Sequence, residues 1–304
     1  MSALPDMPNR PGTPAALTDV AGLADVAAAL AWARAQGLDS LDAKWLLGHG
    51  LGQGRAWLIA HADAALTPAQ AQAYRSACLR RADGEPLAYI VGEREFHGLS
   101  LQVSPAVLVP RPDTELLVDW ALALLPTLPG PRPRVLDLGT GSGAIALAVA
   151  HRHPAAQISA TDISPAALAV AGANAARLGL ALDLAPGPWW QAVAPGSRWH
   201  LVLSNPPYIA AGDPHLPALR HEPALALSPG GDGLGALRDI VAGAPQHLLA
   251  GGWLLLEHGW NQAHAVAAAL RAAGFTAVQT RTDIEARPRC TGGQWPGRPA
   301  PDAA

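Results

Sequence analysis

The stretch that most constrains the fold is an apolar run that leads into a glycine-rich loop and then into a helix-like segment. Residues 134–138 (RVLDL) have β character, residues 139–143 read GTGSG, and residues 144–150 (AIALAVA) favour a helix. A strand, a glycine turn and a helix in this order begin a nucleotide-binding βαβ unit. The spacing G-x-G-x-G differs from the G-x-G-x-x-G of dinucleotide sites, and no lysine follows as in a phosphate-binding P-loop.

Strand-like and helix-like segments alternate along the rest of the chain from residue 131 onward. This alternation predicts an α/β fold with a doubly wound, mostly parallel sheet, in which ligands bind at the carboxyl ends of the strands. The expected strands are 133–138, 156–162, 181–185, 199–204, 252–257 and 275–280, and the expected helices are 144–152, 165–178, 234–249 and 261–273.

Asp162 ends the expected strand 156–162 and lies 23 residues after Gly139. An acid at roughly this offset, about 20 residues, binds ribose hydroxyls in nucleotide-binding folds. Ser164 and Pro165 then read as the N-cap and first residue of the next helix. A glycine-rich turn without a ligand is the alternative reading. A ligand that needs ribose contacts but no phosphate cradle, and that alkylates nitrogen, is S-adenosylmethionine.

The tetrapeptide Asn205-Pro206-Pro207-Tyr208 follows the expected strand 199–204. Such a turn suits the presentation of a planar NH2 group, whose nitrogen is a poor nucleophile because its lone pair is delocalised. Acceptors for both N–H bonds would orient the group and favour a pyramidal nitrogen in the transition state. We expect the Asn205 side-chain oxygen and the Pro206 carbonyl to accept these bonds and Tyr208 to stack on the group. Asn205, Pro206 and Tyr208 are therefore the candidate catalytic residues, although a Pro-Pro turn after a strand can also be only a turn.

Composition excludes several classes of protein. The chain has 304 residues, of which 50% are hydrophobic and 15% charged, and this is typical of a globular protein large enough for two domains. Its formal net charge is −3, so no direct nucleic-acid partner is expected. Cys78 and Cys290 match no metal-binding spacing, which favours free thiols in a cytoplasmic protein and no metal. We expect no signal segment and no membrane span.

The chain is expected to divide into five parts. Residues 1–16 are expected to be disordered, 17–84 to form a helical bundle, 85–112 a β-hairpin linker, 113–294 the catalytic domain and 295–304 a loose tail.

Turn and cap signals support the bundle and the linker. Asp19 and either Asp39 or Ser40 are expected helix caps, Gly48 and Gly50 an expected helix end, and residues 67–70 (TPAQ) an expected capping box. Residues 87–91 and 99–109 are β-like, with Phe96 between them.

Six segments together resemble one known family. They are Gly84-Glu85-Pro86-Leu87-Ala88-Tyr89-Ile90, Arg94-Glu95-Phe96, Val109-Pro110-Arg111-Pro112-Asp113-Thr114-Glu115, Gly139-Thr140-Gly141-Ser142-Gly143, Ser204-Asn205-Pro206-Pro207-Tyr208-Ile209 and Leu256-Glu257-His258-Gly259. The family is the HemK/PrmC type, the N5-glutamine methyltransferases of peptide chain release factors, and the resemblance extends from about residue 20 to residue 293. It implies a Rossmann-like S-adenosylmethionine-dependent methyltransferase fold with a small N-terminal helical bundle.

The resemblance also implies roles for individual residues. Asn205, Pro206, Pro207 and Tyr208 match the glutamine-binding motif, and Phe96 is expected to help wall the substrate amide. The residues implied to bind S-adenosylmethionine are Gly139, Thr140, Gly141, Ser142, Gly143, Asp162, Trp190 and Asn205.

Two departures from the family pattern concern the adenine contact and the preceding strand. Trp189 stands where the family commonly has an acid, so the contact with adenine falls on either Trp189 or Trp190. His200 replaces the usual acid in the strand before the Asn-Pro-Pro motif.

The implied substrate is the glutamine of the Gly-Gly-Gln loop of release factors, docked by the helical domain. The chain also carries its own Gly292-Gly293-Gln294, which is a chance occurrence or, less favoured, a self-methylation segment. Three other functions remain open: an adenine-N6 methyltransferase of DNA or RNA, a glutamine methyltransferase of a ribosomal protein, and a non-catalytic binding protein that kept the fold.

Overall fold

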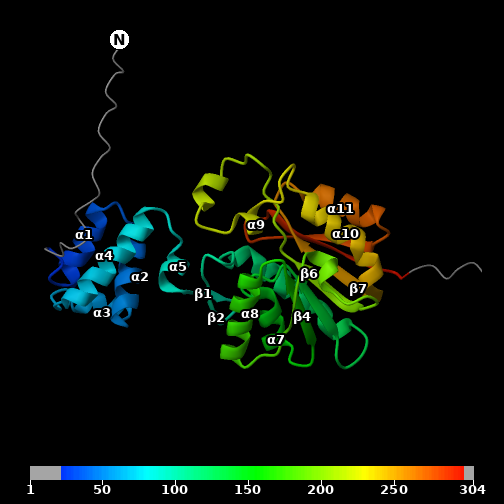
Figure 1. Ribbon diagram of the computed structural model, residues 1–304, viewed down its shortest axis with the longest axis horizontal. Helices are drawn as coiled ribbons and strands as arrows, with labels where there is room; N and C mark the ends of the chain where they lie inside the picture. Colours follow the sequence, from blue (N-terminus) through cyan, green and yellow to red (C-terminus); the bar gives the residue numbers. More distant parts are fainter. Residues whose placement is uncertain (1–21, 298–304) are drawn as a thin grey trace, which may run out of the picture. The chain divides into compact units, whose positions relative to one another are not determined.

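The computed structural model describes residues 22–297, and the chain divides into two compact units between Val91 and Gly92 (Figure 1). The expectations for residues 1–16, for a cap at Asp19 and for the end of the tail beyond residue 297 lie outside the described residues. Between residues 22 and 297, no helix has both the length and the apolar character needed to cross a membrane.

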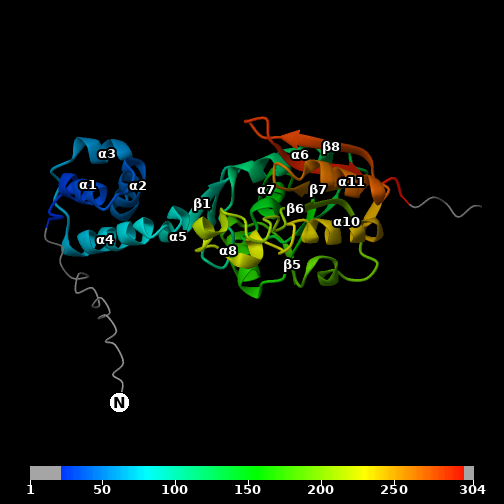
Figure 2. The same ribbon diagram turned by 90° about the horizontal axis from the view of Figure 1, so that it is seen from above.

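The N-terminal unit is helical. Its helices are α1(Val26–Ala35), α2(Ser40–Leu51), α3(Arg55–Ala60), α4(Pro68–Ala82) and α5(Leu87–Val91) (Figure 2). Asp39 caps α2 by accepting a hydrogen bond from the Leu41 N–H, and the expected capping box at the start of α4 is present. Leu47 and Cys78 are both buried in a separate hydrophobic core that these helices share.

Two helical details differ from the sequence expectations. Helix α2 runs through Gly48 and ends at Leu51, because Gly52 supplies the left-handed cap with a φ of 64°. Residues 87–91, which were expected as β, form α5, and the Tyr89 N–H bonds to the Pro86 carbonyl. A short apolar run cannot be assigned to a strand or a helix by periodicity alone.

The second unit begins with a hairpin of β1(Glu93–Phe96) and β2(Leu99–Gln102), which is shorter than expected because β2 ends at Gln102 and not near Val109. Residues 103–111 form an irregular strap that leads to a short 3-10 helix, η1(Pro112–Thr114), and to α6(Glu115–Leu124).

A seven-stranded sheet with the order β5-β4-β3-β6-β7-β9-β8 forms the centre of this unit (Figure 1). Its strands are β3(Arg134–Leu138), β4(Gln157–Asp162), β5(Asp183–Pro186), β6(Trp199–Ser204), β7(Leu248–Glu257), β8(Thr276–Thr282) and β9(Pro288–Gln294). β5, β4, β3, β6 and β7 pair in parallel, so the expected α/β class with a mostly parallel sheet is confirmed.

Helices cover both faces of the sheet, and successive strand residues serve opposite faces. In β6, Leu201 and Leu203 pack in one core cluster, while Val202 between them packs in the other. The first cluster includes residues of α6 and α7(Ala144–Arg152), and the second includes residues of α10(Gly235–His247) and α11(Ala263–Ala272). α8(Pro165–Leu178) contacts β4 and β5.

Strand β9 was not expected, and it contains the Gly-Gly-Gln sequence of this chain. β9 is antiparallel to β7 and β8, between which it lies. A Cβ on Gly292 would lie 2.4 Å from Leu255 Cδ2, so the packing of this strand requires glycine. Gln294 pairs with Trp253, away from the carboxyl end of β7, and its Nε2 donates to the Gly251 carbonyl at 2.9 Å. The self-methylation hypothesis therefore has no structural support, and the ordered domain continues through Trp295, which is buried.

Candidate active site

The glycine loop between β3 and α7 has backbone dihedral angles that residues with a side chain rarely adopt. Gly139, Gly141 and Gly143 all have positive φ angles, of 74°, 56° and 83°. The Gly139 and Thr140 N–H groups both donate to the Thr161 carbonyl at 2.9 Å, which ties the loop to the end of β4. A Cβ on Gly141 would meet nothing within 4 Å, so the backbone at this point borders open space.

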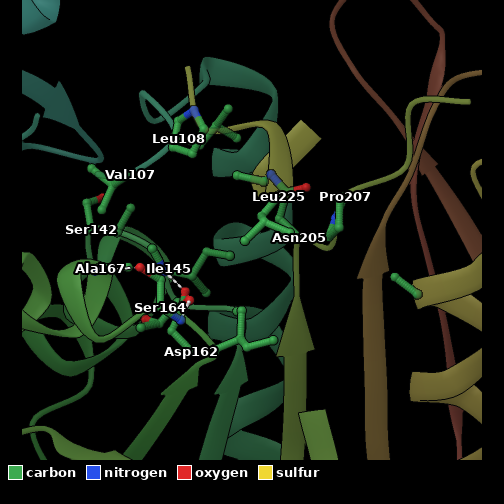
Figure 3. Close-up of a pocket in the computed structure, with 18 of the residues that line it drawn as sticks. Val107, Leu108, Ser142, Ile145, Asp162, Ser164, Ala167, Asn205, Pro207 and Leu225 are labelled. Atoms are coloured by element: carbon green, nitrogen blue, oxygen red, sulfur yellow. Dashed lines mark hydrogen bonds between the residues drawn. The ribbon is translucent and has the colours of Figure 1, made fainter. Parts of the chain in front are cut away.

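Asp162 lies beside this loop at the end of β4 (Figure 3). Its Oδ2 accepts from the Gly141 N–H and its Oδ1 accepts from the Ser164 N–H, both at 2.9 Å. An ionised carboxylate has about four acceptor positions, so two remain for a ligand such as the two hydroxyls of a ribose.

A cavity of about 440 Å³ opens between the glycine loop and the Asn-Pro-Pro-Tyr turn, at the carboxyl end of the parallel strands. This volume is in the range of small-molecule sites. Among the residues that line it are Arg111, Thr114, Gly139, Thr140, Gly141, Ser142, Asp162, Ile163, Trp189, Asn205, Pro207 and Leu225. The open backbone at Gly141, the free acceptor positions of Asp162 and the apolar side chains fit a ligand with a ribose and an aromatic base.

The two neighbouring tryptophans have different surroundings. Trp189 lines the cavity, and its Cζ3 would lie 3.2 Å from a Cβ on Gly139. Trp190 is absent from the lining; its Nε1 donates to the Ile240 carbonyl at 3.1 Å, and its ring stacks on His247 with centroids 4.7 Å apart. Of these two rings, the one that borders the cavity is that of Trp189, and this favours the alternative, Trp189, over Trp190 for a contact with a ligand.

Asn205 reaches the cavity from the end of β6, and its side chain is anchored on one side only. Its Nδ2 donates to Thr114 Oγ1 at 3.1 Å. Within residues 22–297, its Oδ1 has no hydrogen-bond partner. Thr114 is 4% exposed and comes from η1, 91 residues earlier in the chain. This contact orients the Asn205 amide, with its oxygen left free as an acceptor.

The other residues of the motif have different environments. Pro207 lines the cavity, whereas Pro206 is buried and Tyr208 packs against the second core cluster. Phe96 is 1% exposed, belongs to the first core cluster and is not among the residues that line the cavity. The geometry thus does not support Phe96 as a wall of the substrate site, because an aromatic ring buried in the core cannot contact a ligand in the cavity.

Two buried acids, Asp137 and Glu257, contact the cavity-lining residues Thr140 and Thr114, and the sequence alone does not indicate a role for either acid. Burial raises the pKa of Asp137 to about 7, against the lowering effect of hydrogen bonds from Thr140 and the Ala146 N–H. Burial likewise raises the pKa of Glu257 to about 7, and hydrogen bonds from Thr114 and Tyr208 act in the opposite direction. Burial is also the largest cause of the raised pKa of Tyr208, so its phenol stays protonated at neutral pH.

A further contact joins the strap to the segment that follows the Asn-Pro-Pro-Tyr turn. Glu222 is buried, accepts from the Val109 N–H at 3.1 Å and forms an ion pair with Arg111. Arg111 and Thr114 belong to residues 109–115, a segment that the sequence marks only through its resemblance to a known family. Their proximity to Asn205 and Glu222 could not be read from spacing, because about a hundred residues separate the partners.

Comparisons with known proteins show which family the chain belongs to. Two family descriptions match the chain: "PrmC N-terminal domain" at residues 23–92 and "Methyltransferase small domain" at residues 118–273. The release factor glutamine methyltransferase of Bordetella pertussis (strain Tohama I) is 50% identical over 259 residues, which cover 84% of this chain and 95% of that protein. The chain belongs to the release factor glutamine methyltransferase family. A second member, from Xylella fastidiosa (strain Temecula1), is 49% identical over 272 residues, which cover 88% of this chain and 98% of that protein.

Membership of this family confirms the expected enzyme class and cofactor: the chain is an S-adenosylmethionine-dependent methyltransferase. The solved protein-(glutamine-N5) methyltransferase (release factor-specific) of Alicyclobacillus acidocaldarius is 31% identical and covers 64% of this chain and 99% of its own, with a TM-score of 0.40. The catalytic domain of hMettl16, solved in complex with a 3′UTR hairpin, is 15% identical and shares the fold, with a TM-score of 0.54 over 76% of this chain and 84% of its own.

Proposed function

We propose that this enzyme transfers a methyl group from S-adenosylmethionine to the side-chain amide nitrogen (N5) of the glutamine in the Gly-Gly-Gln motif of peptide chain release factors. The names of its relatives support the substrate. The observation that carries the chemistry is Asn205, whose Nδ2 is held by Thr114 while its Oδ1 remains free at the cavity. A free acceptor held in this way suits an amide NH2 group.

The cofactor half of the proposed site consists of the glycine loop, Asp162 and Trp189. Asp162 would accept from the ribose hydroxyls, Trp189 would pack on the adenine, and the open backbone at Gly141 would lie along the ligand. When bound, S-adenosylmethionine supplies a methyl group activated by a positively charged sulfur. Gly139, Thr140, Ser142 and Gly143 complete this half as the loop that shapes it.

The substrate half holds the glutamine amide. Asn205 Oδ1 and the Pro206 carbonyl would accept the two N–H bonds, and Pro207 and Tyr208 would complete the turn around the planar group. With the amide held in this way, its nitrogen would face the methyl group that the bound cofactor supplies, and the surplus proton of the methylated nitrogen would pass to solvent. Orientation of the nitrogen is the main contribution of the protein, since reacting atoms must approach to about 3–3.5 Å in line.

The helical unit is proposed to dock the release factor, so that the loop carrying the glutamine reaches the cavity. Because release factors act on ribosomes, the reaction is expected in the cytoplasm and needs neither a membrane nor direct contact with nucleic acid.

The test is transfer of labelled methyl from S-adenosylmethionine to a purified release factor. Its Gly-Gly-Gln variant with Gln replaced by Ala, a duplex DNA and ribosomal protein serve as parallel substrates. Label on the wild-type factor alone is the expected result. Label on DNA would identify an adenine-N6 enzyme, and label on ribosomal protein would identify the other glutamine methyltransferase; either would overturn the proposal.

A further inference from the structure

Asn174 is a completely buried polar side chain on α8, and no role was assigned to it by the sequence analysis. Its exposed fraction is 0%. A buried amide is costly unless its donors and acceptor are paired, so its partners show what the residue does for the fold.

All the partners of Asn174 are backbone groups of two other segments. Its Oδ1 accepts from the Gln102 N–H at 2.7 Å, and its Nδ2 donates to the Gln102 carbonyl at 2.9 Å. The same Nδ2 donates to the Ser142 carbonyl at 3.0 Å. One side chain thus joins the last residue of β2 to the glycine loop. Helix α8, which carries Asn174, packs against β2 (Figure 1).

The Ser142 carbonyl depends on this contact because of the shape of the loop. In a regular helix, the N–H of Ala146 would bond to this carbonyl, four residues earlier. Among the described residues no hydrogen bond joins that N–H to the Ser142 carbonyl, and the left-handed Gly143 separates Ser142 from α7, which begins at Ala144. Ser142 is itself 3% exposed, so water does not readily replace the missing partner.

We propose that Asn174 is a positioning residue for the cofactor: it holds the Ser142 carbonyl, and with it the glycine loop, in register with the β1–β2 hairpin. The hairpin is the first element of the second unit and directly follows the helical unit in the chain, so Asn174 ties the glycine loop to the start of the second unit. This inference rests on the proposed role of the glycine loop in binding S-adenosylmethionine.

The experiment compares substitutions of Asn174 with one at Arg177, which lies one turn further along α8. Asn174→Leu keeps the volume and removes all three bonds, and Asn174→Asp keeps the acceptor for Gln102 but turns a carboxylate oxygen toward the two carbonyls. Arg177 donates to the Ser100 carbonyl and so contacts the same hairpin but not the loop. Arg177→Ala is therefore the matched control.

The readout is the Kd for S-adenosylmethionine and for S-adenosylhomocysteine, measured by calorimetry at a temperature at which circular dichroism shows each full-length variant to be folded. We expect Asn174→Leu and Asn174→Asp to raise both Kd values about tenfold or more, the effect of losing a well-placed hydrogen bond, and Arg177→Ala to stay within about twofold. A merely structural role would lower the melting temperature and leave the Kd of the folded protein unchanged, and that result would overturn the inference.

A second variant covers the case in which the Asn174 proteins do not fold. Gln102→Pro replaces the N–H that Asn174 Oδ1 accepts with a ring carbon, so it breaks the contact from the hairpin side without a substitution at Asn174. Proline is tolerated where an edge-strand N–H does not face its partner strand. A several-fold rise of the Kd would support the coupling between hairpin and loop, and an unchanged Kd would refute it. If the wild-type enzyme itself failed to bind S-adenosylmethionine, the proposed role of the loop would fall instead.

Discussion

The two halves of the cavity are built in different ways. In the cofactor half, Asp162 binds the N–H groups of Gly141 and Ser164, which lie 21 and 2 residues away in the chain. In the substrate half, Asn205 depends on Thr114, which is 91 residues away.

This difference predicts how amino-acid substitutions in each half of the cavity affect the enzyme. The glycine loop is held by several contacts, to the Thr161 carbonyl, to Asp162 and to Asn174, and each of them supports the shape of the cofactor half. A side chain oriented by a distant hydroxyl loses its direction when a single partner is removed, although the fold remains. We therefore expect substitutions in the first half to change cofactor affinity and substitutions in the second half to change turnover.

The largest effect should come from Asn205→Ala. Loss of the acceptor that orients the substrate nitrogen should lower kcat about 10²–10³-fold, as removal of one catalytic hydrogen-bonding group does in other enzymes. Its Kd for S-adenosylmethionine should stay within about twofold. Methyl transfer to release factor and calorimetry measure the two quantities, and equal losses in both would show that Asn205 belongs to the cofactor half.

The buried acids should make the stability of the fold depend on pH. The pKa of Glu257 is raised from its usual 4.5 to about 7, so its contribution to the free energy of unfolding is fully present below pH 4.5 and is lost as the pH rises through about 7. The loss should amount to about 3 kcal/mol. The free energy of unfolding, measured in urea, should fall less between pH 5 and pH 8 in Glu257→Gln than in the wild type, because Asp137 is then the remaining one of the two acids. An equal fall in the two proteins would contradict the assignment to Glu257.

Asp162→Ala should weaken binding in the cofactor half of the cavity. Removing the carboxylate that holds the glycine loop and binds the ribose should raise the Kd for S-adenosylmethionine about 10–100-fold. Turnover at saturating cofactor should change much less. A Kd within twofold of the wild-type value, measured by calorimetry, would show that another group binds the ribose.

The tryptophan pair offers an internal control within the cofactor half. Trp189→Ala should raise the Kd about tenfold, because a stacked aromatic ring contributes about 1–3 kcal/mol per base. Trp190→Ala should leave the Kd unchanged but lower the melting temperature, since Trp190 packs on α10 and His247. The reverse pattern would restore Trp190 as the adenine contact.

The smallest effect is expected from Thr114→Val, which keeps the shape of the side chain and removes the hydroxyl. Asn205 would lose one hydrogen bond, and kcat should fall about 3–10-fold with an unchanged Kd for the cofactor. Thr114→Ser, which retains the hydroxyl, should restore most of the activity. If both variants were equally impaired, packing of the methyl group and not the hydrogen bond would be the cause.

Sequence alone was sufficient for the features that depend on neighbours in the chain. The strand, glycine loop and helix at residues 134–152, the acid at Asp162 and the position of Asn205 at a strand end follow from local patterns, because positive φ angles need glycine and parallel strands end at a common edge. The capping box at Thr67 is likewise local. These patterns determined the fold class and the general location of the site.

Only the tertiary structure decided which side chains face the cavity. Trp189 and Trp190 are adjacent in sequence but their rings have different surroundings. Trp189 has a positive φ of 43°, and the ring of Trp190 is held by a hydrogen bond to Ile240 on α10. Contacts between segments far apart in the chain also place three other features. Phe96 lies in the core, Gly292 and Gly293 lie in the interior strand β9, and Thr114 contacts Asn205. Long-range packing of this kind leaves no periodic signal in a single sequence, because it depends on how whole elements fit together.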